Sequence, residues 1–166
     1  MSTPSYRLIN PQANRSFVFK WEPFDLTTRW HYHPEIELIY FIEGKTTAVI
    51  GEEFHQFEEG DLVILGANFP HVLQEDFKYL KQYPDARPFG LIIQFTEDFL
   101  GHEFLQKPEM QSLKTMLTKA HHGLSFNKKI IKKVSDPLLQ MHKQSETRKL
   151  ISLLDILMTL SETNKL

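Results

Sequence analysis

The chain has 166 residues, of which 41% are apolar, and its 19 basic and 21 acidic side chains give a net charge of -2. Enough apolar residues are present to build a core, which excludes a disordered or fibrous protein, and the charge provides no overall positive field for nucleic acid. The absence of cysteine excludes disulfides and cysteine-ligated metal centres, so any metal would need nitrogen and oxygen ligands.

The start of the chain carries no targeting signal. Its first 14 residues are polar, and the longest apolar run, Leu38–Ile42, is far too short to cross a bilayer. We therefore expect a soluble cytoplasmic protein without membrane contact. Residues 1–100 hold 8 basic and 15 acidic side chains, whereas residues 101–166 hold 11 basic and 6 acidic. This asymmetry suggests that the two parts do different work.

Short apolar stretches cut by turn residues extend from about residue 16 to residue 96, which is typical of a β-sandwich or barrel. Gly44, Gly51 and Gly60 lie between stretches, where tight hairpin turns require glycine, so neighbouring strands should be antiparallel. Leu38–Ile42 is apolar on both faces, which indicates a strand covered on both sides. The expected strands are Phe17–Trp21, Glu37–Ile42, Thr46–Ile50, Glu53–Phe57, Asp61–Leu65, His71–Leu73 and Phe89–Phe95.

After Phe95 the apolar period changes from 2 to 3.6, which predicts helices at about 97–105, 109–122, 127–143 and 146–163. Gly123 is placed for a helix C-cap and Asn127 for an N-cap. The predicted organisation is an N-terminal arm (1–15), a β-barrel (16–100) and a helical region (101–166). The fold class is thus mainly β with C-terminal helices.

Histidines and a carboxylate gather in the segment before the turn predicted at Gly44. His31, His33 and Glu37 share parity, so in an extended chain they line one face. A barrel would bring a third histidine, His71, beside them. Three imidazoles and one carboxylate suit Fe, Mn, Ni, Cu or Zn, with positions left for water or a ligand.

This pattern resembles the first motif of the cupin superfamily, which His31, His33, Glu37 and Gly44 match without a gap. The resemblance implies a double-stranded β-helix, or jelly-roll, barrel. A second motif keeps Gly60 and His71 in the expected places. It departs from the family at Gly66, Asn68 and Glu75, and this departure concerns metal binding more than fold.

The wider pattern resembles the N-terminal effector-binding and dimerisation region of bacterial AraC/XylS-type transcriptional regulators. The resemblance rests on the order of four segments: His31–Tyr40, Gly60–Leu65 with Pro70-His71, Phe95–Leu100, and Lys149–Leu160. It implies a small-molecule effector, with a sugar among the candidates, and a homodimer. It also implies a helix-turn-helix DNA-binding domain after residue 166, which this sequence does not contain, so DNA contact would be made only through that domain.

The last predicted helix carries apolar side chains on more than one face, so one stripe should face its own domain and another a partner. The resemblance makes a second copy the expected partner. The residues assigned to this dimer interface are Leu150, Leu153, Leu154 and Leu157. The alternative is that this helix is simply central to the monomer.

Three interpretations of the histidine cluster remain open: a metal site formed by His31, His33, Glu37 and His71, a metal-free pocket for an organic effector, or a structural cluster. The effector-binding candidates are Trp30, His31, His33, Glu37, Tyr40 and His71. Tyr40 has the opposite parity to Glu37, so both would line one cavity only across a bulge. The leading hypothesis is a non-enzymatic effector-sensing domain that controls an attached DNA-binding domain. The alternative is a metal-dependent cupin enzyme, a dioxygenase or isomerase, with the same four residues as ligands.

Overall fold

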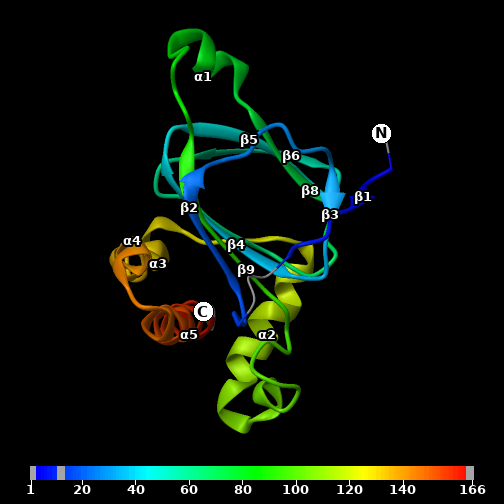
Figure 1. Cartoon of the computed structure of the whole chain (residues 1–166), viewed down its shortest axis with the longest axis vertical. Coiled ribbons are helices and arrows are strands. Elements are labelled where there is room, and N and C mark those ends of the chain that lie inside the picture. Colours follow the sequence, from blue (N-terminus) through cyan, green and yellow to red (C-terminus); the bar gives the residue numbers. More distant parts are fainter. Residues whose placement is uncertain (1–2, 11–13, 164–166) are drawn as a thin grey trace.

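The residues that the structure describes, 3–10 and 14–163, form two five-stranded sheets that face each other and enclose a barrel (Figure 1). The structure is a computed structural model. The strand orders are β1-β3-β8-β5-β6 and β10-β7-β4-β9-β2. The strands are β1 (Ser5–Tyr6), β2 (Val18–Pro23), β3 (His31–Tyr32), β4 (Ile36–Glu43), β5 (Lys45–Ile50), β6 (Glu53–Glu58), β7 (Leu62–Leu65), β8 (His71–Glu75), β9 (Phe89–Phe95) and β10 (Leu124–Ser125).

β4 lies between β7 and β9, and both of its faces are buried. Ile39 and Phe41 point into the barrel and join its inner core. Leu38 and Tyr40 point outwards and join a second core, which the outer face of the sheet shares with the C-terminal helices. This double coverage explains why the strand is apolar on both faces.

Most helices follow β9 and pack on the outer face of the β4-containing sheet, below the barrel in Figure 1. The expected fold class, a β-barrel followed by helices, is confirmed. No helix in the described part of the chain is long and apolar enough to cross a membrane. The α-helices are α1 (Phe77–Gln82), α2 (Gln111–Lys119), α3 (Lys128–Ile131), α4 (Ser135–Gln140) and α5 (Glu146–Thr163), and the 3-10 helices are η1 (Phe104–Gln106), η2 (Pro108–Met110), η3 (Ala120–His122) and η4 (Met141–Lys143).

Two helix predictions are wrong. Residues 97–105 form turns that lead into η1 instead of a helix, and residues 127–143 break into α3, α4 and η4. Asn127 does cap α3, its side chain accepting from the Ile130 N–H. Pro137 prevents a continuous helix, because proline lacks an N–H and its ring clashes with the carbonyl four residues earlier. The periodicity of the apolar residues continues through the break and therefore did not reveal it.

α5 buries a stripe of side chains inside its own protomer. Leu153 and Leu157 are fully buried in the core that α5 shares with α2 and the barrel. Both were predicted to face a second copy, and the structure corrects this, because they are already covered within one chain. Leu150 and Leu154 are only partly buried, and Ile151 next to them is 51% exposed.

The N-terminal arm adds a short strand to the edge of the first sheet. β1 pairs in parallel with β3, and the Arg7 N–H donates to the Tyr32 carbonyl at 2.9 Å. Ile9 is buried. Residues 1–2 and 11–13 of the expected arm, and residues 164–166 of the helical region, lie outside the described residues. The arm therefore lies against the strand that carries His31.

β2 contacts the helical region through its outer face. The Trp21 ring stacks on His142 of η4, with ring centroids 4.0 Å apart and planes at 17°. The Lys149 ammonium of α5 lies 4.7 Å from the centre of the Phe19 ring. Alternate residues of β2 therefore connect the barrel to the end of the chain.

A glycine marks the closest approach between the barrel and the helices. The Gly66 N–H, just after β7, donates to the Ala120 carbonyl of η3 at 2.7 Å. A Cβ atom at Gly66 would lie 2.6 Å from the Cα of His121. Only glycine allows this contact, which gives Gly66 a packing role at a position where the sequence departs from the second cupin motif.

Candidate functional site

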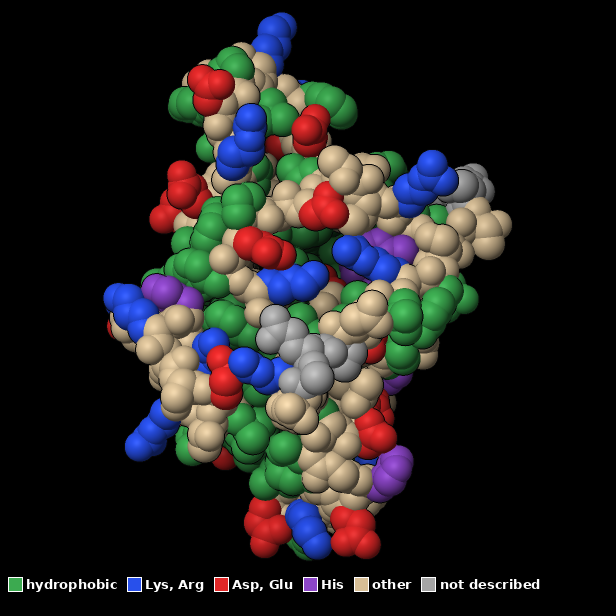
Figure 2. All heavy atoms as spheres, viewed as in Figure 1, with side chains coloured by type: hydrophobic (Ala, Val, Ile, Leu, Met, Phe, Trp, Pro, Cys, Tyr) green, Lys and Arg blue, Asp and Glu red, His purple; other side chains and the backbone are tan. Residues whose placement is uncertain are grey.

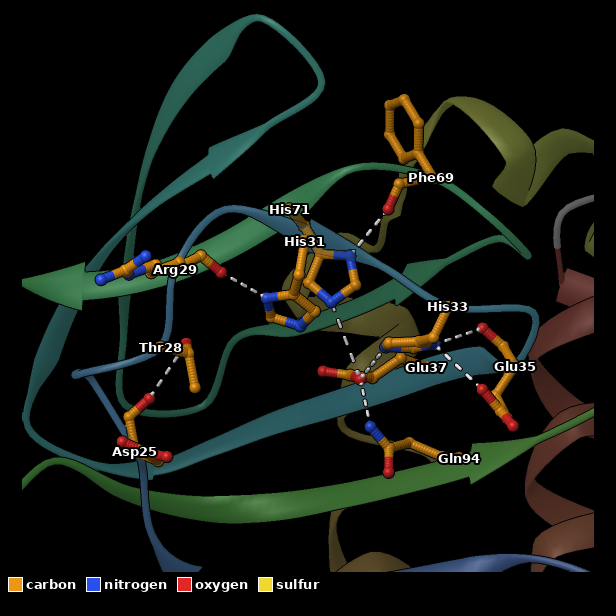
Figure 3. Close-up of polar contacts among 10 residues, drawn as sticks. All are labelled: Asp25, Thr28, Arg29, His31, His33, Glu35, Glu37, Phe69, His71 and Gln94. Carbon is orange, nitrogen blue, oxygen red and sulfur yellow. Dashed lines mark hydrogen bonds and ion pairs between the residues drawn. The ribbon is translucent and has the colours of Figure 1, made fainter. Parts of the chain in front are cut away.

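Three histidines and a glutamate converge inside the barrel (Figure 3). His31 lies on β3 and pairs directly with His71 on β8, while His33 follows β3 and Glu37 lies on β4. One ring nitrogen from each histidine lies within 4.8 Å of the others. All four side chains are buried, with 2–6% of each residue exposed. The predicted convergence of these four residues is confirmed as geometry, and their role stays a prediction.

Each histidine ring is fixed by a backbone carbonyl. The Nδ1 atoms of His31, His33 and His71 lie 2.7, 3.1 and 2.8 Å from the carbonyl oxygens of Arg29, Glu35 and Phe69 respectively. A carbonyl only accepts, so each Nδ1 carries the hydrogen and donates. The Nε2 atoms are thereby turned toward the centre of the cluster. A hydrogen bond from the ring nitrogen that faces away from a metal orients a histidine for metal ligation.

Glu37 is the anionic centre of the cluster. Its Oε2 accepts from Gln94 Nε2 at 2.6 Å, and it lies 3.0 Å from His33 Nε2 and 3.8 Å from His71 Nε2. Burial alone would raise the pKa of the Glu37 carboxyl, but its contacts with His33 and His71 outweigh burial and hold the pKa well below its usual range. Glu37 is therefore ionised at neutral pH.

His31 and His71 have pKa values shifted in opposite directions. Burial is the main reason that the pKa of His31 falls to about 4. Burial would also lower the pKa of His71, but the nearby Glu37 carboxylate and the Phe69 carbonyl outweigh it and raise that pKa. At neutral pH His31 is thus a neutral imidazole, the form that binds metals.

The cluster fits a divalent metal. It supplies imidazole nitrogens and one carboxylate oxygen, which are ligand types for Zn, Ni, Fe and Mn. Nε2 of His71 is buried and has no hydrogen-bond partner in the described part of the molecule. A bound cation would satisfy this atom and balance the charge of Glu37, while Gln94 would hold the carboxylate in place.

A cavity of about 50 Å³ lies beside the cluster at the open end of the barrel. His31, Glu37 and His71 line it, together with Gln94 of β9. Its rim is formed by residues from three separate segments: Arg7, Lys20, Glu22, Asp25 and Thr28.

Trp30 and Tyr40, both predicted to bind the effector, do not line this cavity. Tyr40 belongs to the outer core, because a regular strand places it opposite Glu37. The indole N–H of Trp30 is buried without a hydrogen-bond partner among the described residues. The structure corrects the prediction that these two aromatic side chains contact a ligand there.

Sequence reasoning missed Arg7, Lys20 and Gln94. Gln94 had a local signal, since it is the single polar residue in the apolar run Leu91–Phe95 and has the parity of Ile92, which also lines the cavity. Lys20 alternates with Phe19 and Trp21 on β2, but its inward direction depends on pairing with β9. Arg7 had no local signal, because only pairing of the arm with β3 brings it to the cavity.

Acidification is expected to destabilise the metal-free protein through His31. Its pKa is about 4 in the folded chain against 6.5 without burial, so below pH 6.5 unfolding takes up a proton at this ring. The free energy of unfolding should fall as the pH drops from 6.5 toward 4, by up to about 2 kcal/mol. Urea denaturation of chelator-treated wild type and His31→Gln measures the difference.

Two other groups of the cluster, His71 and Glu37, change the stability mainly outside this pH interval. His71 has a raised pKa, so below pH 6.5 it is protonated in both states, and its stabilising contribution is lost only as the pH rises above that value. Ionised Glu37 stabilises the fold at neutral pH, and this contribution is lost only as the pH falls below 4.5, the ordinary pKa of a glutamate. His31→Gln should flatten the pH dependence, whereas His102→Gln, at a side chain 91% exposed, should not. An unchanged slope in His31→Gln would contradict the assignment.

Comparison with known proteins agrees with the barrel. Residues 17–77 match the cupin domain family. In structure the chain is similar to apo ToxT from Vibrio cholerae, with 9% identity and a TM-score of 0.50, covering 90% of this chain and 55% of ToxT. It is also similar to the AraC-like transcriptional activator CuxR, with 7% identity and a TM-score of 0.45, covering 78% of this chain and 42% of CuxR.

A Cupin 2 conserved barrel domain protein from Salinispora arenicola is similar at 19% identity, with a TM-score of 0.40, covering 56% of this chain and 74% of that protein. No protein with a curated description matches the sequence. At such identities the likenesses concern the fold, which is that of a cupin barrel carrying C-terminal helices.

Proposed function

We propose that this chain is the effector-binding part of an AraC-type transcriptional regulator, in which a small molecule binds in the barrel cavity and alters the helices through which two copies associate. The observation that carries the proposal is that β2 and β4 each line the cavity with one face and pack against the C-terminal helices with the other. On β4, Glu37 lines the cavity and Leu38 packs against the helices. On β2, Lys20 lines the cavity and Trp21 stacks on η4.

This arrangement provides a direct mechanical path from ligand to helix. A ligand shifts a protein between two states only when it binds them with different affinity. A displacement of β2 or β4 by a ligand changes the packing of their outer faces, because side chains of both faces belong to one backbone. The similarity to ToxT extends over 90% of this chain and so includes the helices as well as the barrel, which supports treating them as one unit.

A divalent metal, Zn, Ni, Fe or Mn, held by His31, His33, Glu37 and His71, is part of the proposal. When bound, such an ion supplies a Lewis-acidic centre on which an oxygen of the effector can bind. The backbone carbonyls behind the three Nδ1 atoms orient the rings, and Gln94 orients the carboxylate. The protein's contribution is therefore a preformed and buried ligand set.

The alternative, a metal-dependent cupin enzyme, needs an acid or base beside the reacting molecule. Glu35 and Glu75 are the carboxylates that lie next to the two histidine motifs in the sequence, and neither lines the cavity. Glu35 lies on the far side of His33 from His31 and His71 (Figure 3), and Glu75 is exposed at the end of β8. Besides Glu37, the carboxylates among the described residues that line the cavity are Glu22 and Asp25, and both are exposed at its rim. Neither lies buried beside the cluster, and a sensing role is therefore favoured.

Dimerisation gives the first test. We assign the interface to the partly exposed stripe of α5 formed by Leu150, Ile151 and Leu154, in place of the buried Leu153 and Leu157. Light scattering at high micromolar concentration is expected to give twice the 19.5 kDa of one chain. The double variant Ile151→Glu/Leu154→Glu should be monomeric, because each carboxylate would lie unpaired in an apolar interface.

Arg148→Glu, at an exposed position of the same helix that the 100° turn per residue places away from the stripe, is the control and should remain dimeric. Fusing the chain to a DNA-binding domain that holds its operator only as a dimer extends the test to regulation. The wild-type fusion should control a reporter, and the double variant should not. A monomeric wild-type chain and an inert fusion would contradict the proposed function, and turnover of a small molecule by the metal-loaded chain would favour the enzyme.

A further inference from the structure

Two cationic side chains border the cavity without partners. Arg7 follows β1 and Lys20 lies on β2, and both are half-buried and line the cavity. Within the ranges that the structure describes, neither side chain has an ion pair or hydrogen bond, whereas Lys45 of β5 and Lys128 of α3 pair with Glu58 and Asp61. A half-buried cation that forms no direct ion pair or hydrogen bond is available to bind an anion.

Asp25 is an acidic residue of the rim, and the charges of these two cations help to lower the pKa of its carboxyl after its hydrogen bonds with Thr27, but it forms no direct ion pair with either. Asp25 is exposed, and its carboxylate accepts from the N–H and hydroxyl of Thr27 at 3.1 and 2.6 Å. Glu22 is exposed at the outer edge. Figure 2 shows the opening from outside, with blue Lys and Arg side chains and red Asp or Glu side chains bordering a hollow where purple histidine is visible. Arg7 and Lys20 are therefore more buried than Glu22 and Asp25, the two carboxylates of the rim.

The bottom of the cavity offers an unused acceptor. Gln94 Nε2 donates to Glu37, and because a carboxylate only accepts, this contact fixes the orientation of the Gln94 amide. Oε1 of Gln94 is left buried without a hydrogen-bond partner among the residues described. A ligand that satisfies it must bring a donor such as a hydroxyl group.

The size of the cavity limits the ligand. Its volume of about 50 Å³ holds a few water molecules, since a cavity needs roughly 10–15 Å³ to hold one. A molecule with a handful of non-hydrogen atoms fills it. A disaccharide or an aromatic effector would extend out of this enclosed space toward the solvent.

We propose that the cavity takes a small hydroxy acid, with its carboxylate between Arg7 and Lys20 and its hydroxyl donating to Oε1 of Gln94. The proposal rests on the proposed function only in treating this cavity as the sensing site. It names the ligand class from charge, hydrogen bonding and volume together.

Calorimetric titration of the full chain with L-lactate and glycolate tests the proposal. Propionate, which lacks the hydroxyl, and lactamide, which lacks the charge, are the comparison ligands. Lactate should bind at least about tenfold more tightly than either, because each loses one buried polar contact. Arg7→Gln and Lys20→Gln should each weaken lactate about tenfold or more and leave lactamide unchanged. Gln94→Met should abolish the preference for lactate over propionate.

Arg29→Gln is the matched control, since Arg29 is exposed in the loop before β3 and does not line the cavity. Equal binding of lactate and lactamide, normal lactate affinity in Arg7→Gln and Lys20→Gln, or no binding of either acid would overturn the proposal. Lactate binding that chelation abolishes but the Arg7 and Lys20 variants preserve would assign the carboxylate to the metal instead. The dimer and reporter results are independent of these titrations, so failure of the proposed function is distinguishable from failure of the ligand class.

Discussion

His71→Ala is expected to abolish binding of divalent metal to the chain. The buried Nε2 of His71 has no hydrogen-bond partner among the described residues, and the Phe69 carbonyl holds the ring through Nδ1. Loss of an orienting contact alone costs metal affinity about 10- to 100-fold, and loss of the ligand itself should cost more than that. Calorimetric titration with Zn²⁺ and Ni²⁺, together with metal analysis of the purified protein, measures the change.

The same variant should lose the thermal stabilisation that metal gives to wild type. A metal at 100 times its dissociation constant adds about 2.7 kcal/mol to the free energy of unfolding, provided that it binds only the folded chain. His55→Ala is the control, because His55 lies on β6, outside the cluster. A wild-type chain that binds none of Zn²⁺, Ni²⁺, Fe²⁺ and Mn²⁺ would contradict the metal site and favour the metal-free pocket.

Gly66→Ala is expected to destabilise the packing of the helices on the barrel. The added Cβ would lie 2.6 and 2.7 Å from the Cα and N of His121 and 2.8 Å from the carbonyl carbon of Ala120, all backbone atoms that cannot rotate away. Separating the segments also weakens the hydrogen bond from Gly66 to Ala120. The free energy of unfolding should fall by about 3 kcal/mol, from overpacking and the weakened bond together. Urea denaturation followed by circular dichroism measures it.

Gly101→Ala separates crowding from backbone conformation. Gly101 has φ of +93° but nothing within 4 Å of its added Cβ. This variant should cost only about 1–2 kcal/mol, from a left-handed backbone conformation that alanine disfavours. Gly66→Ala with no greater loss than Gly101→Ala would show that η3 moves aside easily, and the tight contact would then have no energetic role.

Local pattern predicted the barrel well because its strands are short and bounded by glycines. Parity placed His33 and Glu37 together, since side chains two or four apart in an extended chain share a face. The pattern did not predict β3 with the arm beside it, because two-residue strands exist only through their partners. The position of Arg7 at the cavity depends on that pairing, and the residues around Arg7 in the sequence do not predict it.

Apolar periodicity was also ambiguous in the helical region. The last helix has apolar side chains around more than one face, so sequence alone did not decide which leucines meet the protomer's own core. The structure assigns Leu153 and Leu157 to that core and leaves Ile151 exposed. Gly66 departs from the second cupin motif in the sequence, and in the structure it allows η3 to approach the barrel.

The hydrogen bond between Gln94 and Glu37 joins residues 57 positions apart in the chain. His31 and His71 are likewise paired between strands that close the barrel from opposite parts of the sequence. Contacts of such long range form late in folding, because the entropy of closing large loops must first be overcome. During synthesis, a nascent chain that ends before β9 holds all three histidines but lacks the residue that fixes their carboxylate. The complete site is therefore a property of the finished barrel, and no fragment ending before Gln94 can contain it.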